Sequence, residues 1–178
     1  MRIAVFGGSF DPVHTEHIRL AQAAIEELGL DKLFVMPAHA PPHKPGKVLS
    51  PDNDRLEMCR LAFADNPKVT VSDYEIAKGG TSYTYLTCRH FKEVYQGAEI
   101  FWIVGTDMLR DFPTWRYPED ILKSVTLAVC GRAKRTAGGR KNSARSLKNS
   151  AWNLPVFPTT ARRCPQRKFA FWQGQVCV

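Results

Sequence analysis

The sequence predicts an α/β fold, a Rossmann-like doubly wound parallel sheet with helices on both faces. Short runs rich in β-branched and aromatic residues alternate with longer stretches in which apolar residues recur every three or four positions. Strands that alternate with helices form a parallel sheet whose ligand site lies at the carboxyl ends of the strands. Because 178 residues suit one well-buried domain and are short for two, we expect a single core.

Sharp changes of pattern define the first elements. RIAVF (2–6) is an apolar run that ends at two glycines, as a buried strand does. Over residues 15–28 apolar positions recur at helical spacing, and Gly29 is a favourable helix stop. KLFVM (32–36) is the second strand, and the Pro- and His-rich segment 37–47 that follows it is expected to be a loop.

The later elements repeat this alternation. Ser50-Pro51 sets a helix start, and the apolar stripe of that helix consists of Leu56, Cys59 and Phe63. A further helix is expected over residues 83–95 because its apolar positions keep the helical period. Three β-branched and aromatic runs are expected to be strands: VTVS (69–72), EIFWIV (99–104) and VTLAV (125–129).

The C-terminal segment differs from the rest of the chain in charge and pattern. Residues 1–120 hold all 17 acidic residues and 13 basic ones, whereas residues 121–178 hold 12 basic residues and no acid. No apolar periodicity remains beyond Gly131, so we predict a folded domain over 1–132 and an atypical, poorly ordered basic tail over 133–178. The excess of basic residues behind the net charge of +8 lies in the C-terminal segment alone, while residues 1–120 hold more acids than bases. Nucleic acid is therefore a disfavoured partner. A nucleic-acid-binding protein that uses the tail is the alternative from a different functional class.

Composition also predicts where the chain works. No run reaches the roughly 18 apolar residues of a membrane span, so no membrane partner is expected. The N-terminal residues lack the apolar segment and cleavage site of a signal peptide. The five cysteines show no CxxC pairing and no zinc spacing, which favours reduced thiols and a cytoplasmic location. The sequence carries no signal for an oligomeric state.

Two histidines three residues apart follow the first strand. Gly7 and Gly8 let the backbone approach a phosphate closely, and the start of the next helix offers unpaired N–H donors. His14 and His17 lie on one face of that helix start, so both imidazoles can reach one anion above the strand end. Two alternatives stay open here: a metal-ligand pair, for which no third ligand stands out, and a histidine pair with no role in catalysis.

The segment GGSFDPVHTEH resembles the signature of the nucleotidyltransferase superfamily whose hallmark is H-x-G-H. With the later segments PPHK, TSYT and DFPTW, residues 1–132 are similar to the bacterial nicotinate-nucleotide adenylyltransferases. The resemblance implies transfer of AMP from ATP to nicotinate mononucleotide, giving nicotinate adenine dinucleotide and pyrophosphate, with Mg²⁺ bridging phosphate oxygens. Another adenylyltransferase of the superfamily, acting on nicotinamide mononucleotide or pantetheine phosphate, is the alternative within the same enzyme class.

The resemblance also implies roles for individual residues. His14 and His17 are the expected catalytic pair, which contacts the phosphates and stabilises the transition state. The residues expected to bind ATP are Gly7, Gly8, Ser9, Phe10, His14, His17, Gly105 and Asp107. Those expected to bind the mononucleotide are His43, Lys44, Thr81, Tyr83, Thr84, Asp107, Trp115, Arg116 and Tyr117. No metal ligand from the protein is expected.

Some of these residues have a structural alternative, and one position departs from the family. Lys44 in a Pro-rich loop can be a solvated charge, and the hydroxyls of TSYT can cap a helix. Trp115 can anchor a small apolar cluster instead of stacking on the pyridine ring. Glu16 stands where the family usually has Gly, and we expect its carboxylate to point to solvent from the first helical turn.

The tail lacks a motif that similar proteins have. They continue, after the strand that matches residues 125–129, with another strand and a helix opened by I/V-S-S-x-x-I-R, which clamps the ATP phosphates. In a neighbouring reading frame, the codons of residues 164–177 permit S-S-A-E-I-R. We therefore hypothesise that a frame shift near residues 132–135 replaced the family's last strand and helix, and we expect weak or absent turnover and poor solubility.

Overall fold

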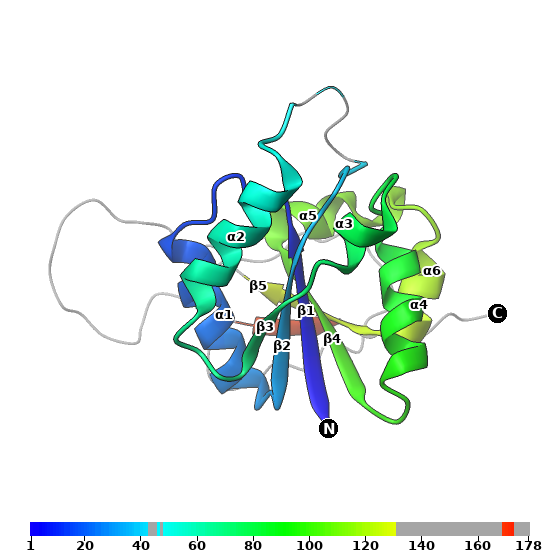
Figure 1. Cartoon of the computed structure of the whole chain (residues 1–178). Coiled ribbons are helices and arrows are strands. Elements are labelled where there is room, and N and C mark those ends of the chain that lie inside the picture. Colours follow the sequence, from blue (N-terminus) through cyan, green and yellow to red (C-terminus); the bar gives the residue numbers. More distant parts are fainter. Residues whose placement is uncertain (43–45, 47, 131–168, 173–178) are drawn as a thin grey trace, which may run out of the picture.

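The computed structural model describes residues 1–42, 46, 48–130 and 169–172, the last four by their backbone alone. One sheet with the order β3-β2-β1-β4-β5-β6 forms its centre (Figure 1). Neighbouring strands from β3 to β5 pair in parallel, whereas β6 pairs antiparallel with β5. The strands are β1 (Arg2–Gly8), β2 (Lys32–Pro37), β3 (Val69–Val71), β4 (Glu99–Gly105), β5 (Thr126–Cys130) and β6 (Phe169–Trp172).

Helices connect the parallel strands. Because the chain reverses its direction of strand addition after β3, the connections cover both faces of the sheet. Figure 1 shows α1 and α2 beside one face and α4 and α6 beside the other. The described helices are α1 (Thr15–Leu28), α2 (Asp52–Phe63), α3 (Tyr74–Lys78), α4 (Thr84–Val94), α5 (Thr106–Asp111), the 3-10 turn η1 (Phe112–Thr114) and α6 (Pro118–Ser124).

The central strand β1 contributes to two separate cores because successive strand residues face opposite sides. Ile3 and Val5 are buried among the side chains of α4 and α6. Ala4 and Phe6 are buried among those of α1 and α2. Burial on both faces explains why the strand sequences are continuously apolar, and it confirms the predicted doubly wound α/β fold.

The predicted strands are confirmed, with ends that differ by one or two residues. The predicted helices also form, and Gly29 caps α1 in a left-handed conformation with φ of 58°. The sequence analysis missed the short elements α3, α5, η1 and α6. It also predicted a purely parallel sheet, whereas residues 169–172 add one antiparallel strand at the edge. The other tail residues, the predicted domain boundary and the hypothesised site of the frame shift lie outside the described residues.

Close packing accounts for both glycines at the end of β1. A Cβ atom on Gly7 would lie 2.9 Å from the indole of Trp102, which is on the neighbouring strand β4. A Cβ atom on Gly8 would lie 3.2 Å from the ring of Phe10. Glycine therefore allows both aromatic rings to pack directly on the backbone at the carboxyl end of β1.

Candidate active site

The two histidines form a stacked pair at the mouth of α1. His14 has extended backbone angles and caps the helix, while His17 lies in the first turn. Their ring centroids are 3.7 Å apart with an angle of 24° between the planes. The backbone N–H of His14 donates to Nδ1 of His17 over 3.2 Å. Because Nδ1 of His17 accepts this bond, a neutral His17 ring carries its proton on Nε2 and can donate it to an anion.

The surroundings of His17 favour the neutral ring. Burial and, to a smaller degree, the neighbouring His14 together lower the pKa of His17 from 6.5 to about 4. The ring packs against Phe6 and Phe10, with centroid distances of 5.8 and 5.0 Å. At neutral pH His17 is therefore a hydrogen-bond donor without a net charge, beside the aromatic rings of Phe6 and Phe10.

The unusual Glu16 does not face the histidines. Its carboxylate accepts a hydrogen bond from Nη1 of Arg19 at 2.7 Å, and both side chains are largely exposed. The expectation that this carboxylate points to solvent is confirmed. An acidic side chain in the first turn is also favourable beside the positive end of the helix.

Hydrogen bonds connect the loop between β1 and α1, which leads to His14, with the loop that precedes α2. The carboxylate of Asp11 accepts bonds from the backbone N–H and the hydroxyl of Ser50, at 3.1 and 2.7 Å. Nη1 of Arg55 donates to the carbonyl oxygen of Ser9 over 2.8 Å. Arg55 is completely buried, so these contacts fix the relative position of the two loops.

A cavity of about 710 Å³ lies between the loop after β2 and the start of α4. Two stretches of chain are joined at its wall, because Ala40 forms an isolated parallel bridge with Thr81 and Ser82 N–H donates to the Ala40 carbonyl over 2.9 Å. Nδ1 of His39 lies in a short hydrogen bond with the carboxylate of Asp52. The residues that line the cavity include His39, Pro41, Ser50, Asp52, Thr81 and Tyr83.

Three of the residues predicted to bind the mononucleotide lie together, and a fourth begins α4. Tyr83, Arg116 and Tyr117 come together: the Arg116 guanidinium lies 4.9 Å from the Tyr83 ring centroid and 5.4 Å from that of Tyr117. Hydrogen bonds to these two tyrosines raise the pKa of Arg116. Thr84 begins α4, and Tyr83 caps the helix without a side-chain hydrogen bond.

Trp115 lies in the core instead of at an open surface. It is 6% exposed and packs against Phe112, with ring centroids 5.4 Å apart. The anchor that the sequence left as an alternative therefore describes its packing, while stacking on a pyridine ring stays a prediction. Gly105 ends β4 and Asp107 is exposed in the first turn of α5. His43 and Lys44 lie outside the described residues.

Sequence reasoning missed three residues that connect the two loops: His39, Asp52 and Arg55. An arginine on a helix ordinarily reads as a surface residue because charged side chains are rarely buried completely. The available signal was the spacing of Asp52 and Arg55, which places an acid and a base on the same side of α2. Their partners, at positions 9, 39 and 50, could not be read from spacing.

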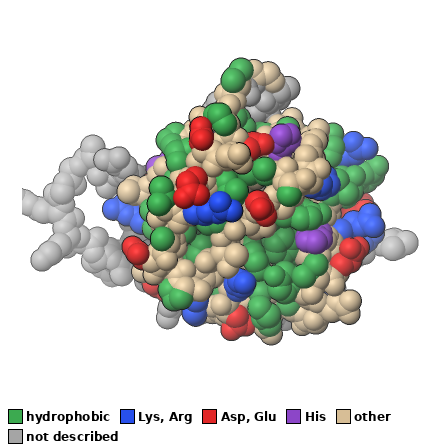
Figure 2. All heavy atoms as spheres, viewed as in Figure 1, with side chains coloured by type: hydrophobic (Ala, Val, Ile, Leu, Met, Phe, Trp, Pro, Cys, Tyr) green, Lys and Arg blue, Asp and Glu red, His purple; other side chains and the backbone are tan. Residues whose placement is uncertain are grey.

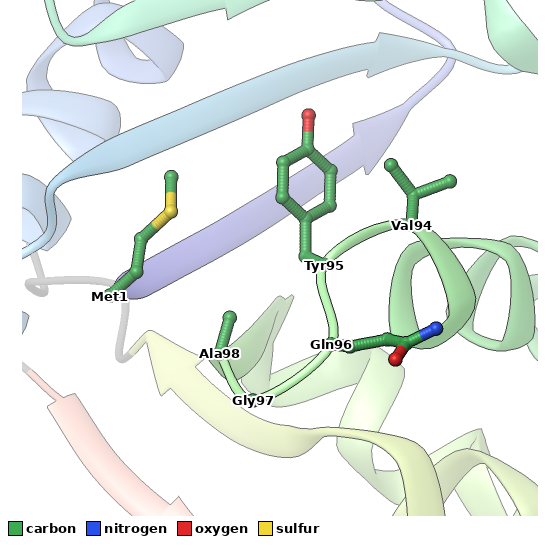
Figure 3. A pocket seen from close by; sticks show the side chains of 6 residues that line it. All are labelled: Met1, Val94, Tyr95, Gln96, Gly97 and Ala98. Carbon is green, nitrogen blue, oxygen red and sulfur yellow. The ribbon is translucent and has the colours of Figure 1, made fainter.

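A second hollow has no connection with this site. It has a volume of about 420 Å³ and is lined by Met1 and residues 94–98 (Figure 3). Met1 and Ala98 immediately precede β1 and β4, so this hollow lies at the amino ends of the strands, opposite to the histidines. Among the residues that line it, only Tyr95 has an ionisable side chain. We assign it no part in the chemistry.

The described residues also bear on metal, membrane and polyanion binding. Within the described ranges, no three His, Cys, Asp or Glu side chains come together as a metal site. None of the helices described there has the length and apolar character to cross a bilayer. On the face shown in Figure 2, basic and acidic side chains are interspersed. This mixed face gives no support to a polyanion surface there.

The cytidylyltransferase-like family matches residues 5–166. A probable nicotinate-nucleotide adenylyltransferase of Thermotoga sp. is 44% identical over 135 residues, which cover 74% of this chain and 67% of the relative. A probable nicotinate-nucleotide adenylyltransferase of Albidiferax ferrireducens is 40% identical over 157 residues, which cover 88% of this chain and 79% of the relative. The chain spans 64–67% of the first curated relatives that it matches.

A solved structure shares the fold. Plasmodium falciparum nicotinic acid mononucleotide adenylyltransferase complexed with NaAD aligns with a TM-score of 0.66 at 19% identity. The alignment covers 75% of this chain and 65% of that one. At this identity the likeness concerns the arrangement of strands and helices.

Proposed function

The chain belongs to the cytidylyltransferase-like family and, within it, to the nicotinate-nucleotide adenylyltransferases, and on this premise we propose that it transfers the adenylyl group of ATP to nicotinate mononucleotide. The products are nicotinate adenine dinucleotide and pyrophosphate. The observation that carries the proposal is the stacked histidine pair at the mouth of α1; the loop that precedes this pair is hydrogen-bonded through Asp11 to Ser50, which lines the cavity.

The reaction needs alignment and charge stabilisation more than covalent help from the protein. A phosphate oxygen of the mononucleotide forms a bond to the α-phosphorus of ATP. The bond from that phosphorus to the bridging oxygen of the β-phosphate breaks, and pyrophosphate leaves with the electron pair. His14 and His17 are proposed to donate hydrogen bonds to the phosphate oxygens on which negative charge develops.

The neutral state of His17 suits this task. An uncharged donor does not hold pyrophosphate as strongly as a fixed cation would, while its Nε2–H still stabilises the developing charge. His14 is the exposed member of the pair and is proposed to contact the same group of oxygens. Gly7 and Gly8 end β1, Ser9 and Phe10 continue toward this pair, and all four are proposed to line the ATP side.

The cavity is proposed to hold the mononucleotide. Its volume of about 710 Å³ lies in the usual range of small-molecule sites. Thr81 and Tyr83 supply hydroxyls at its wall, and Arg116 is held beside Tyr83. Lys44 is proposed to neutralise phosphate with His43 as its neighbour, and the site is completed by Thr84, Asp107, Trp115 and Tyr117.

Mg²⁺ is proposed to enter as the complex with ATP. The described residues offer no group of three or more acidic, His or Cys side chains to hold it. Mg²⁺ often keeps several waters and binds mainly through substrate phosphates, which fits such a site. Its chemistry would be to neutralise charge on the triphosphate oxygens.

The direct test is pyrophosphate release with MgATP and nicotinate mononucleotide. Parallel reactions with nicotinamide mononucleotide and phosphopantetheine separate the three acceptors. His17→Ala should lower turnover by about 100-fold or more, as loss of a transition-state donor does, whereas His90→Ala should leave it unchanged. His90 is a suitable control because its ring, on α4, stacks on Tyr74 of α3 and is not a member of the His14–His17 pair.

A version whose tail follows the alternative reading frame separates a wrong function from a disabling tail. Release by the frame-restored version alone would assign the reaction to the folded domain and its loss to the tail. No release by either version, with any of the three acceptors, would refute the proposed function.

A further inference from the structure

We propose that Arg55 is a positioning residue that fixes the loop between β1 and α1 relative to the cavity, an inference that rests on the proposed function. Its guanidinium touches neither the histidine rings nor, within the described residues, the cavity surface. It acts through the groups that it binds. Catalysis should therefore respond to the shape of this side chain as well as to its charge.

Arg55 joins three separate points of the chain. Nε donates to the Ser50 carbonyl over 3.0 Å, Nη1 donates to the Ser9 carbonyl over 2.8 Å, and Nη2 binds Oδ1 of Asp52. The side chain is 0% exposed, so water cannot replace these partners. The rigid fork of a guanidinium can serve three acceptors in different directions, which a single ammonium group cannot do in the same geometry.

On one side Arg55 fixes the turn below the histidines. The Ser9 carbonyl belongs to the peptide unit that leads into Phe10, whose φ of 45° is unusual for a bulky residue. The Phe10 ring is buried and packs in T-shaped arrangements on Phe6 and on His17, with ring centroids 5.4 and 5.0 Å apart. If the bond from Arg55 is lost, this peptide unit can rotate, and the ring that supports His17 moves with it.

On the other side Arg55 fixes the wall of the cavity. The second carboxylate oxygen of Asp52 binds Nδ1 of His39, and both of these residues line the cavity. The backbone N–H of His39 donates to the Ser82 hydroxyl over 3.0 Å. His39 is therefore held from its ring and from its backbone, and the ring contact depends on the orientation that Arg55 gives to Asp52.

The matched pair of variants is Arg55→Lys and Arg60→Lys. Both change an arginine of α2, but Arg60 is exposed and makes only a long pair with Glu57 at 3.5 Å within the described residues. Arg55→Lys should lower kcat about 10- to 100-fold and change KM for ATP and the mononucleotide less than about threefold, because misalignment acts on the reacting complex. Arg60→Lys should change neither constant.

A second readout does not require turnover. In the ligand-free full chain labelled with ¹⁵N-histidine, Arg55→Lys should shift the ring nitrogen signals of His17 and His39 and leave those of His90 in place. Asp52→Asn should shift His39 and leave His17 nearly unchanged, since the bond from Arg55 to Ser9 remains. This variant also serves if Arg55→Lys does not fold.

The results distinguish this proposal from the proposed function. A chain that releases no pyrophosphate would refute the function, while the ring signals would still test the coupling. The positioning role is overturned if Arg55→Lys melts at a lower temperature but keeps kcat and KM near the wild-type values. Ring signals that do not move in a folded Arg55→Lys chain would overturn it as well. Should that variant not fold, unchanged His39 signals and kinetic constants in Asp52→Asn would decide against it.

Discussion

Replacing His17 by Asn should reduce the loss of stability that the chain suffers on acidification. In the folded chain the pKa of His17 lies near 4, because burial and the neighbouring His14 both disfavour the protonated ring. The unfolded ring titrates at its ordinary value of 6.5. Between these values the unfolded state binds more protons than the folded state, so stability falls as the pH falls. Above about pH 7.5 the ring is almost fully neutral in both states, so its titration no longer changes the free energy of unfolding.

The size of the effect follows from the two pKa values. Between about pH 7.5 and about pH 5 the linkage relation gives a loss of about 2 kcal/mol from this ring. Since His17 is only partly buried, solvent screening reduces the expected figure to about 1 kcal/mol. The Asn variant removes the titrating ring, while its side-chain oxygen can still accept the bond from the His14 N–H.

Urea unfolding followed by tryptophan fluorescence measures this difference at both pH values. The free energy of unfolding of the wild-type chain minus that of His17→Asn should fall by about 1 kcal/mol from the higher to the lower pH. The contributions of other titrating groups cancel in this difference. His90→Gln controls for the removal of a histidine elsewhere. If His17→Asn and the wild-type chain lose stability in parallel between the two pH values, the inferred burial of a neutral ring is wrong.

Three further substitutions test packing and the outward position of Glu16. Gly7→Val should cost about 1–3 kcal/mol in urea unfolding, because its side chain would overlap the indole of Trp102; an unchanged midpoint would contradict this contact. Ile121→Ala should cost about 2–5 kcal/mol by the same assay, since this residue of α6 is fully buried, and a cost well below 1 kcal/mol would contradict its place in the core. Glu16→Gln removes an exposed pair with Arg19, so stability should change by less than about 1 kcal/mol and KM for ATP by less than about threefold. A tenfold drop in that KM would show that the carboxylate faces the phosphates.

The long elements were predictable because their patterns are local. The inner strands β1, β2 and β4 are buried on both faces and read as continuous apolar runs, and α1 keeps its apolar spacing through all 14 residues. The short helices were not predictable in this way. Helices of five to seven residues, such as α3, α5 and α6, offer too few turns for a periodic signal and depend on tertiary packing.

The site was predictable to the extent that its residues are neighbours in sequence. His14 and His17 are three positions apart on one helix, so their pairing could be expected and is observed. The contact of Arg55 with Ser9 spans 46 positions, and no local rule selects these two partners. The burial of Trp115 likewise depends on residues far away in the sequence, because its core cluster includes strand residues such as Val5 and Trp102.

Within the part of the chain that the structure describes, both outermost strands of the sheet are very short. β3 has three residues and β6 has four, so these strands offer few backbone groups to a foreign strand. Long, flat edges are the usual template on which another chain adds a strand and begins to aggregate. Because β6 covers the side of β5 that would otherwise be such a template, this chain should resist edge-to-edge association for as long as that strand stays paired.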